Sequence, residues 1–312
     1  MKWRQKAPES VSCNLCSSNE TETYLRVKEW TLVRCRQCGL ICLNPRPSTC
    51  ELPELYTSEY FTQVISSDSI DLPTDERGIE ARIWSQALRV RRVGQYASPP
   101  GRLLDIGCGP GYFLACAARE GWDVQGIDIS RWAVDYAKEH LGLDVQVGTP
   151  DRIDELWHND FDVITLFHLL EHLPDPLETL QAIKGALRDK GIIVITVPNM
   201  GGFEARYYGK SWRGLSIPYH LYHFTPVTIT QMLGKAGFNV LTVRKQPSQL
   251  VANWIKKLIG RRSRPESEED GNETDGAAPS APQISTISKI YATTVGRIFT
   301  GRGMTVVARK VE

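Results

Sequence analysis

The sequence has no long hydrophobic run and no excess of charge of either sign. No window of about 18 consecutive apolar residues occurs along the chain, which argues against a membrane-spanning helix. The 37 basic and 36 acidic side chains give a net charge of +1, so the composition does not indicate a nucleic-acid partner. The first residues, MKWRQKAPES, carry positive charge but no apolar segment follows them, and we therefore expect no secretory signal.

The cysteines are unevenly distributed, because six of the eight fall within the first fifty residues. In a chain without an export signal, thiols are expected to stay reduced, and metal binding is favoured over disulfides. Two CxxC pairs separated by eighteen residues match the spacing of a zinc ribbon. The sequence thus predicts a cytoplasmic protein with a closed, structural Zn²⁺ site formed by Cys13, Cys16, Cys35 and Cys38. Cys42 and Cys50 are expected to be spare thiols, and the first fifty residues to be loop-like.

From residue 102 onward, short apolar segments alternate with capped helical segments. Helices are expected to start near Gly111, Ser130, Asp175 and Thr225, and Gly191 is expected to follow the third of them. This alternation predicts an α/β fold, a Rossmann-like doubly wound sheet with helices on both faces. The expected strands are 102–106, 123–129, 144–147, 161–167, 192–197, 239–244 and 304–309.

Composition shifts divide the chain into five expected segments. A zinc ribbon (1–50) is followed by a helical connector or lid (51–98), in which residues 75–97 have a helical pattern. The main core covers 99–245 and its final strand 302–312, with an insertion at 246–301 between them. The centre of the insertion is rich in Ser, Pro, Gly, Glu and Asp, a composition typical of disorder.

The flanks of the insertion are amphipathic. Residues 248–262 combine an apolar face, including Trp254, with a basic one, a pattern suited to a membrane interface. Packing on the domain or on a second subunit would explain the same pattern, and we favour packing. A homodimer and a peripheral position at the inner face of a membrane are therefore both retained as alternatives.

The segment LLDIGCGPG (103–111) ends a predicted strand and opens a helix. Open α/β sheets bind ligands at this edge, and glycines let the ligand approach the backbone. Asp128 ends the next strand, 21 residues after Gly107, where an acid can reach the two ribose hydroxyls of a nucleoside. Both NAD and S-adenosylmethionine fit this much. The acid at Asp105 and the missing GxGxxG favour S-adenosylmethionine, which has an ammonium group and no pyrophosphate.

LLDIGCGPG, GIDIS and FDVITLFHLLEHLPDP resemble motifs of class I S-adenosylmethionine-dependent methyltransferases. The resemblance covers roughly 100–245 and the last strand, and it implies a seven-stranded sheet whose last strand is antiparallel. Gly148-Thr149-Pro150 stands where the family usually has Gly-Asp-Ala near adenine. The implied cofactor-binding residues are Asp105, Gly107, Gly109, Gly111, Asp128, Ile129, Asp151 and Phe167.

Four histidines are candidates for the catalytic base, since histidine titrates near neutral pH and methylation of a hydroxyl profits from a base. His168 and His172 follow the fourth strand, whereas His220 and His223 lie just before a helix, and we expect the base to be one of the latter two. A structural role in tying the loops together is the alternative for each. The His-x-x-Glu-His pattern around Glu171 also matches a zinc-protease signature, which we take as accidental because it does not lie within a helix. Quinone-pathway O-methyltransferases, which this segment also resembles, have Glu-x-x-Glu-His at a proposed divalent-ion site, and His168 in place of the first Glu weakens a hard-cation site.

The acceptor is expected to be a small, sugar-like molecule. The segment PNMGGFEARYYGKSWRGLSIPYHLYHFTP resembles enzymes of bacterial polysaccharide and glycolipid biosynthesis, and its aromatic residues suit a polyhydroxylated ring. No nucleic-acid partner is expected, because the ribbon lacks a dense basic patch. The alternative function is a catalytically inactive zinc-ribbon and Rossmann module that acts as a scaffold.

Overall fold

The computed structural model describes residues 8–48, 72–150, 153–248, 250–251 and 300–311. Several features predicted from the sequence lie wholly or mostly outside these ranges: Cys50, the first part of the connector, Asp151, and the insertion with its amphipathic flanks and its centre. No helix within the described ranges is long and apolar enough to cross a membrane.

The main sheet has seven strands in the order β10-β11-β8-β7-β4-β5-β6. The central strands pair in parallel, whereas β11 pairs antiparallel with both β8 and β10. The doubly wound sheet with an antiparallel last strand is therefore confirmed. The strands are β4 (Arg102–Ile106), β5 (Asp123–Asp128), β6 (Val145–Val147), β7 (Phe161–Phe167), β8 (Leu187–Pro198), β10 (Phe238–Pro247) and β11 (Thr300–Lys310).

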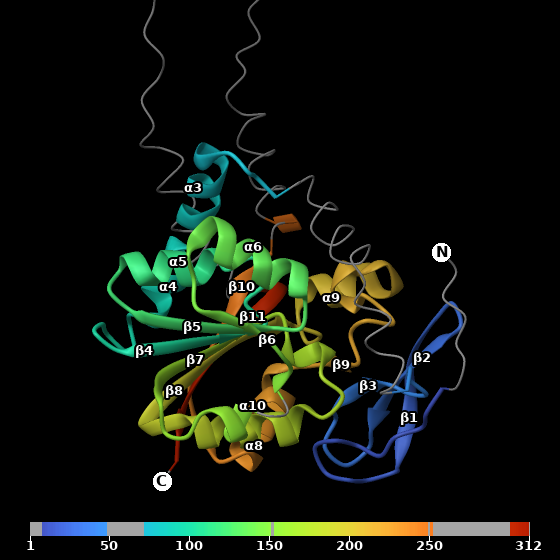
Figure 1. The fold of residues 1–312 in the computed structure, drawn as a ribbon. Coiled ribbons are helices and arrows are strands. Elements are labelled where there is room, and N and C mark those ends of the chain that lie inside the picture. Colours follow the sequence, from blue (N-terminus) through green and yellow to red (C-terminus); the bar gives the residue numbers. More distant parts are fainter. Residues whose placement is uncertain (1–7, 49–71, 151–152, 249, 252–299, 312) are drawn as a thin grey trace, which may run out of the picture.

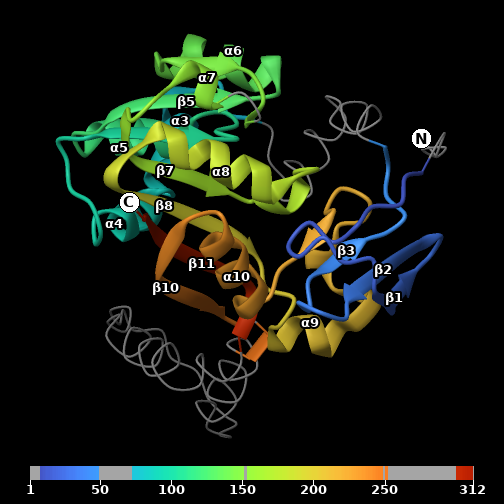
Figure 2. The ribbon, with the colours of Figure 1, turned by 90° about the horizontal axis from the view of Figure 1, so that it is seen from below.

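Helices cover both faces of this sheet (Figures 1 and 2). One face carries α4 (Ala87–Val93), α5 (Tyr112–Arg119) and α6 (Arg131–Leu141). The other carries α8 (Pro176–Ala186) and α10 (Pro226–Lys235). The predicted caps are present: Ser130, Asp175 and Thr225 each accept a hydrogen bond from a backbone N–H in the first turn of their helix. The shorter helices are α3 (Glu76–Trp84), α7 (Ile153–Leu156) and α9 (Phe203–Tyr208).

Two helical segments differ from the prediction. The helix expected over 75–97 is two helices, because the chain leaves helical pairing at Ser85 and Gln86 between α3 and α4. The helix after Asp175 ends at Ala186, not just before Gly191. Leu187 is fully buried and already pairs with Phe161 of β7. The pairing of β8 with β7 is then irregular over the three exposed residues 188–190 and resumes where Ile192 pairs with Val163. The apolar signal of this single buried leucine is too short to mark the start of a strand.

The described part of the ribbon, residues 8–48, is not loop-like as expected but contains a small antiparallel sheet. Its strands are β1 (Thr21–Val27), β2 (Trp30–Cys35) and β3 (Ile41–Leu43). The fourth strand, β9 (Tyr222–His223), lies much later in the sequence, after β8. Ile41 pairs with His223 and Cys42 with Tyr222. Buried residues of this small sheet belong to the same apolar cluster as one face of the main sheet. The ribbon, blue in Figure 1, therefore packs on the main domain as part of its core.

Candidate active site

The glycine loop lies between β4 and α5 at the carboxyl end of the parallel strands. Gly107, Gly109 and Gly111 all have positive φ, at 75°, 52° and 81°. At Gly111 a Cβ atom would lie 2.5 Å from Leu143 Cδ1, so helix packing requires glycine there. At Gly109, in contrast, a Cβ atom would meet nothing within 4 Å. The space in front of Gly109 is therefore open to a ligand.

Asp128 faces this open space from the end of β5. Its Oδ2 accepts the Gly109 N–H at 2.8 Å, and its Oδ1 accepts the Ser130 N–H at 2.8 Å. Burial raises the pKa of Asp128, and these two hydrogen bonds oppose the rise. Each carboxylate oxygen has a further lone pair, so the fixed carboxylate can accept hydrogen bonds from two neighbouring hydroxyls.

Asp105 lies behind the loop and is only 3% exposed. The Thr165 hydroxyl donates to its Oδ1 at 2.6 Å. Burial raises the pKa of Asp105 to about 7, although Thr165 and the guanidinium of Arg89 act in the opposite direction. A cation that binds beside Asp105 would favour its ionised form.

Arg89, on α4, was missed by the sequence analysis. Its guanidinium lies 4.9 Å from the centroid of the Phe167 ring, and Phe167 packs edge-on against Phe113 of α5. Burial lowers the pKa of Arg89, and Asp105 opposes this shift. The arginine is thus part of the same site as the glycine loop. A basic residue on the helix before the loop was the available signal, but α4 contains three arginines and the helical period does not distinguish them.

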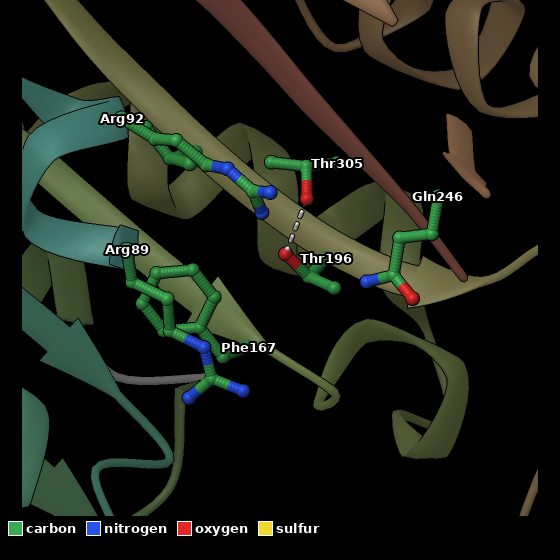
Figure 3. A pocket seen from close by; sticks show the side chains of 7 residues that line it. Arg89, Arg92, Phe167, Thr196, Gln246 and Thr305 are labelled. Atoms are coloured by element: carbon green, nitrogen blue, oxygen red, sulfur yellow. Dashed lines mark hydrogen bonds between the residues drawn. The ribbon is translucent and has the colours of Figure 1, made fainter. Parts of the chain in front are cut away.

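A pocket opens beneath α4 next to Phe167 (Figure 3). It lies where β7, β8 and β11 run side by side under the helix. Its lining residues are Arg89, Arg92, Phe167, Val194, Thr196, Gln246 and Thr305.

The four candidate histidines come from two segments that meet in space. His168 follows β7 with a φ of 58°, and its side chain is 47% exposed. His172 ends a 3₁₀ turn (Leu170–His172), and its ring packs at right angles on that of His220, with centroids 4.6 Å apart. His223 lies further in, with its centroid 6.3 Å from that of His220. The loop after β8 therefore does fold over the loop after β7.

Three of these imidazoles are anchored to backbone carbonyl oxygens. Because a carbonyl only accepts, each ring donates an N–H to it and keeps the other nitrogen unprotonated. Burial lowers the pKa of His172 and of His223 to about 3, and it lowers the pKa of His220 as well. All three rings are therefore neutral at physiological pH. The bonds join His172 Nδ1 to Tyr219, His220 Nδ1 to Gly214 and His223 Nε2 to Leu215, at 3.1, 2.9 and 3.1 Å.

Glu171 is the buried acid of this cluster. The side chain is fully buried, and within the described part of the chain no donor lies at hydrogen-bond distance from either oxygen. The nearest histidine nitrogen, His168 Nδ1, is 3.5 Å from Oε1, longer than an ordinary hydrogen bond. Burial alone would raise the pKa of Glu171, but the surrounding histidines lower it to about 2. Ligand atoms of Glu171, His172 and His220 lie within 4.8 Å of one another, so this donor set could also hold a cation.

The four cysteines of the CxxC pairs converge at one end of the ribbon. The Sγ atoms of Cys13 and Cys38 are 3.4 Å apart, and those of Cys16 and Cys35 are 3.5 Å apart. All four sulfur atoms lie within 4.8 Å of one another. A tetrahedral ion with sulfur ligands at roughly 2.3 Å needs sulfur atoms about 3.8 Å apart, which this group can satisfy. Cys42 is buried in β3 and is not among the four.

The ribbon holds both histidine segments. Arg46 is 7% exposed and donates to the Pro174 carbonyl at 2.8 Å and to the Tyr222 hydroxyl at 3.1 Å. Asn14 bonds the cap residue Asp175 at 2.7 Å. The sequence analysis missed Arg46, because nothing local in Asn-Pro-Arg-Pro shows that two of its partners, Pro174 and Tyr222, lie more than 120 residues away.

Most of the implied cofactor residues lie at this edge of the sheet. Ile129, predicted as the last residue of its strand, lies one residue beyond the observed end of β5 and is 44% exposed. Phe167 is the last residue of β7. Asp151 is outside the described residues. The positions fit a common site, while the individual roles stay predictions.

Comparison with known proteins identifies the family. The chain is 34% identical over 110 residues to a ubiquinone biosynthesis O-methyltransferase of Actinobacillus pleuropneumoniae, covering 31% of this chain and 46% of the relative. It is 35% identical over 103 residues to the protein of the same name from Alkalilimnicola ehrlichii, covering 31% and 42%. The chain thus spans less than half the length of these curated relatives.

A solved S-adenosylmethionine-dependent methyltransferase from Archaeoglobus fulgidus shares the fold. Its TM-score is 0.51 at 21% identity, over 73% of this chain and 94% of that one. The model of the methyltransferase domain family matches residues 81–243, more than half of the chain. These residues run from α3 through the glycine loop and both histidine segments to β10. The chain therefore belongs to the methyltransferase domain family.

Proposed function

We propose that this protein transfers a methyl group from S-adenosylmethionine to a hydroxyl oxygen of a small acceptor. The observation that carries the proposal is the juxtaposition of two half-sites. An open glycine loop faced by Asp128 lies at the end of β4, and an exposed histidine, His168, follows the neighbouring strand β7. The glycine loop and Asp128 suit the binding of a nucleoside with an amino-acid tail, and His168 is suited to accept the proton of the acceptor hydroxyl.

The residues present fit the cofactor. The open space at Gly109 admits the part of the cofactor that lies close to the protein backbone, and Asp128 accepts hydrogen bonds from the ribose hydroxyls. The exposed Ile129 offers an apolar contact for adenine. At the amino-acid end, Arg89 pairs with the carboxylate and Asp105 favours the ammonium group. When bound, the cofactor supplies a methyl group already activated by its sulfonium.

In this proposal the protein contributes chiefly by alignment. The glycine loop and the histidine segments hold the two reactants in line, and His168 accepts the proton of the hydroxyl. His168 is preferred to His220 and His223 as the base, because its side chain is half-exposed, whereas burial lowers the pKa of both His220 and His223 and so makes them weaker proton acceptors. Glu171, 3.5 Å from His168 Nδ1, stabilises the charge that His168 acquires.

The sugar-like character of the acceptor is a finer proposal. Tyr207 and Tyr208 are 62% and 41% exposed and can stack on an apolar ring face. Trp212, expected to line the acceptor, is instead buried at 3% exposure and packs over Gly214. The relatives named above act in ubiquinone biosynthesis, which makes a phenolic hydroxyl the competing acceptor.

We also propose that the four-cysteine group binds a structural zinc ion. All four positions around the ion are filled by thiolates, so the ion has no coordination site for a reactant. By holding the ribbon together, the ion would fix the position of β3. Because β3 pairs with β9, this would also fix His223, which lies on β9.

Cys35→Ser is expected to remove one equivalent of zinc and to lower the unfolding midpoint. The expected decrease is at least about 5 °C, since 1 kcal/mol shifts the midpoint of a domain this size by about 2–4 °C. Metal analysis and thermal unfolding measure the two effects. Cys42→Ser, at a buried cysteine outside the group, is the control and should keep its zinc. Retention of all zinc by Cys35→Ser would exclude the assignment.

Calorimetric titration with S-adenosylhomocysteine tests the cofactor proposal. The intact protein should bind it and should not bind NADH. Asp128→Ala should weaken binding about 100-fold and Arg89→Gln at least about tenfold, since hydrogen bonds to charged groups contribute about 1.5–3 kcal/mol each. Arg91→Gln, on the same helix but outside the pocket, should bind normally. No binding of S-adenosylhomocysteine would favour the scaffold alternative.

The raised pKa of Asp105 predicts that cofactor binding releases a proton. With a pKa of about 7, Asp105 is partly protonated in the free protein, and a neighbouring ammonium group ionises it. Affinity for S-adenosylhomocysteine should therefore rise up to about tenfold per pH unit below pH about 7 and level off above it. Calorimetry in buffers of different ionisation enthalpy counts the proton. Asp105→Asn should lose this pH dependence; an unchanged profile in that variant would disprove the prediction.

A methyl-transfer assay with radiolabelled cofactor tests the acceptor proposal. The acceptors compared are sugar hydroxyls, a catechol and a primary amine. His168→Gln should lower kcat by about 10²–10⁴ while S-adenosylhomocysteine affinity stays within about twofold, because the base acts only on the chemical step. Transfer to the amine alone would refute O-methylation, and transfer to the catechol but not to sugars would refute the sugar-like acceptor.

A further inference from the structure

The pocket beneath α4 contains basic and neutral polar side chains and no acidic one. Arg89 and Arg92, one helical turn apart on α4, form its roof. Val194 and Thr196 of β8 and Thr305 of β11 form the opposite wall, and Gln246 of β10 closes one end. A pocket with this lining is suited to a ligand that carries negative charge.

The two arginines point to different parts of the pocket (Figure 3). The guanidinium of Arg89 lies beside the Phe167 ring and is the one that interacts electrostatically with Asp105 behind the glycine loop. Arg92 extends instead toward Thr196 and Thr305, and Gln246 approaches the same threonine pair from the other side. The pocket therefore has a second group of donors that the cofactor carboxylate on Arg89 does not use.

The second group has hydrogen atoms to donate. The hydroxyls of Thr196 and Thr305 are 3.0 Å apart, and when one donates to the other a single O–H is left for a ligand. The amide of Gln246 adds N–H donors. A Cβ atom at residue 303 would lie 2.8 Å from Gln246 Oε1, so Gly303 provides the room in which this side chain lies.

Among the described residues, no acid neutralises the charge of Arg92. No ion pair between Arg92 and a carboxylate occurs within the described part of the chain. Its nearest charged neighbour in the pocket is Arg89, whose pKa it lowers. Two cations that share a pocket with donors and no acid bind an oxyanion favourably.

We propose that Arg92, Gln246 and the Thr196–Thr305 pair bind an anionic group of the acceptor, a phosphate or a carboxylate. Phe167 lines the site, and the backbone N–H of the next residue, His168, donates to the carbonyl of Thr196 at 2.8 Å, so the acceptor hydroxyl would meet the base close by. The inference rests on the proposed function in one respect, since it assumes that Arg89 binds the carboxylate of the cofactor and is not available to the acceptor. It narrows the acceptor to hydroxyl compounds that also carry an oxyanion, such as a sugar phosphate or a hydroxy acid.

Inorganic phosphate is the probe for this site. The full chain is saturated with S-adenosylhomocysteine, and its unfolding midpoint is followed against phosphate concentration, with ionic strength kept constant by chloride. A saturable rise in midpoint is expected, as for any ligand that binds only the folded state. A parallel series with acetate distinguishes a carboxylate subsite, which would respond to both anions, from a phosphate subsite.

Three variants of one helix locate the binding. Arg92→Gln should weaken phosphate binding at least about tenfold, since a hydrogen bond to a charged group is worth more than that factor. Arg92→Lys keeps the charge without the planar fork and should give an intermediate loss. Arg91→Gln changes net charge equally, one position along α4 and outside the pocket, and should bind phosphate as the parent does. Each variant must bind S-adenosylhomocysteine normally, which shows that it is folded.

Several outcomes overturn the proposal. The first is that neither anion raises the unfolding midpoint of the parent protein. The second is that Arg91→Gln loses phosphate binding as much as Arg92→Gln does. The third is that phosphate binds only when S-adenosylhomocysteine is absent. The last result would assign the whole pocket to the cofactor carboxylate. Failure of the proposed function has a different signature, because S-adenosylhomocysteine would then not bind, whereas Arg92-dependent phosphate binding could still be measured on the free protein.

Discussion

The arrangement of the acceptor side depends on one short backbone ladder, the antiparallel pairing of β3 with β9. Ile41 pairs with His223, the Leu43 N–H donates to the Leu221 carbonyl, and the Leu221 N–H donates to the Glu171 carbonyl. These bonds join the ribbon, the segment after β8 and the turn after β7 into one continuous network. Since backbone hydrogen bonds are directional, the two histidine segments cannot shift independently of the ribbon. The ribbon is therefore a wall of the site as well as a neighbouring domain.

The same network offsets an electrostatic cost. An ionised carboxylate buried without donors costs several kcal/mol, and the Glu171 oxygens have none at hydrogen-bond distance among the described residues. Arg46 helps to keep the surrounding walls in place through the Pro174 carbonyl and the Tyr222 hydroxyl. A buried charge beside a half-exposed histidine becomes favourable when that histidine is protonated. In the proposed reaction, Glu171 would stabilise His168 after it accepts the proton of the acceptor.

The cofactor side was predictable from sequence, and the acceptor side was only partly so. The glycine loop, Asp128 and the helix caps depend on residues close along the chain, and the structure has them at the predicted places. The number of strands and the antiparallel last strand followed from the resemblance. The strand β3 was missed in part because one of its partners, β9, lies nearly 200 residues away, and the break at Ser85 interrupts a continuous helical pattern. The hairpin of β1 and β2 is local, and the cysteine-rich composition of this segment hid it. Arg46, Arg89 and Arg92 are long-range contributions, since an arginine in sequence shows its charge but not its partners.

In the proposed arrangement, α4 would couple cofactor binding to acceptor binding. Arg89 and Arg92 lie on one face of a short helix, and their mutual repulsion lowers the pKa of Arg89 in addition to the effect of burial. An anion bound to either guanidinium reduces this repulsion and so favours the charge of the other. A cofactor carboxylate at Arg89 would therefore lessen the repulsion that Arg92 experiences beside it. Conversely, an acceptor with no anionic group would leave the guanidinium of Arg92 in the pocket without a counter-charge. If both proposals hold, α4 would help to hold the cofactor and would also select the acceptor, whereas the ribbon on the opposite side positions the histidines.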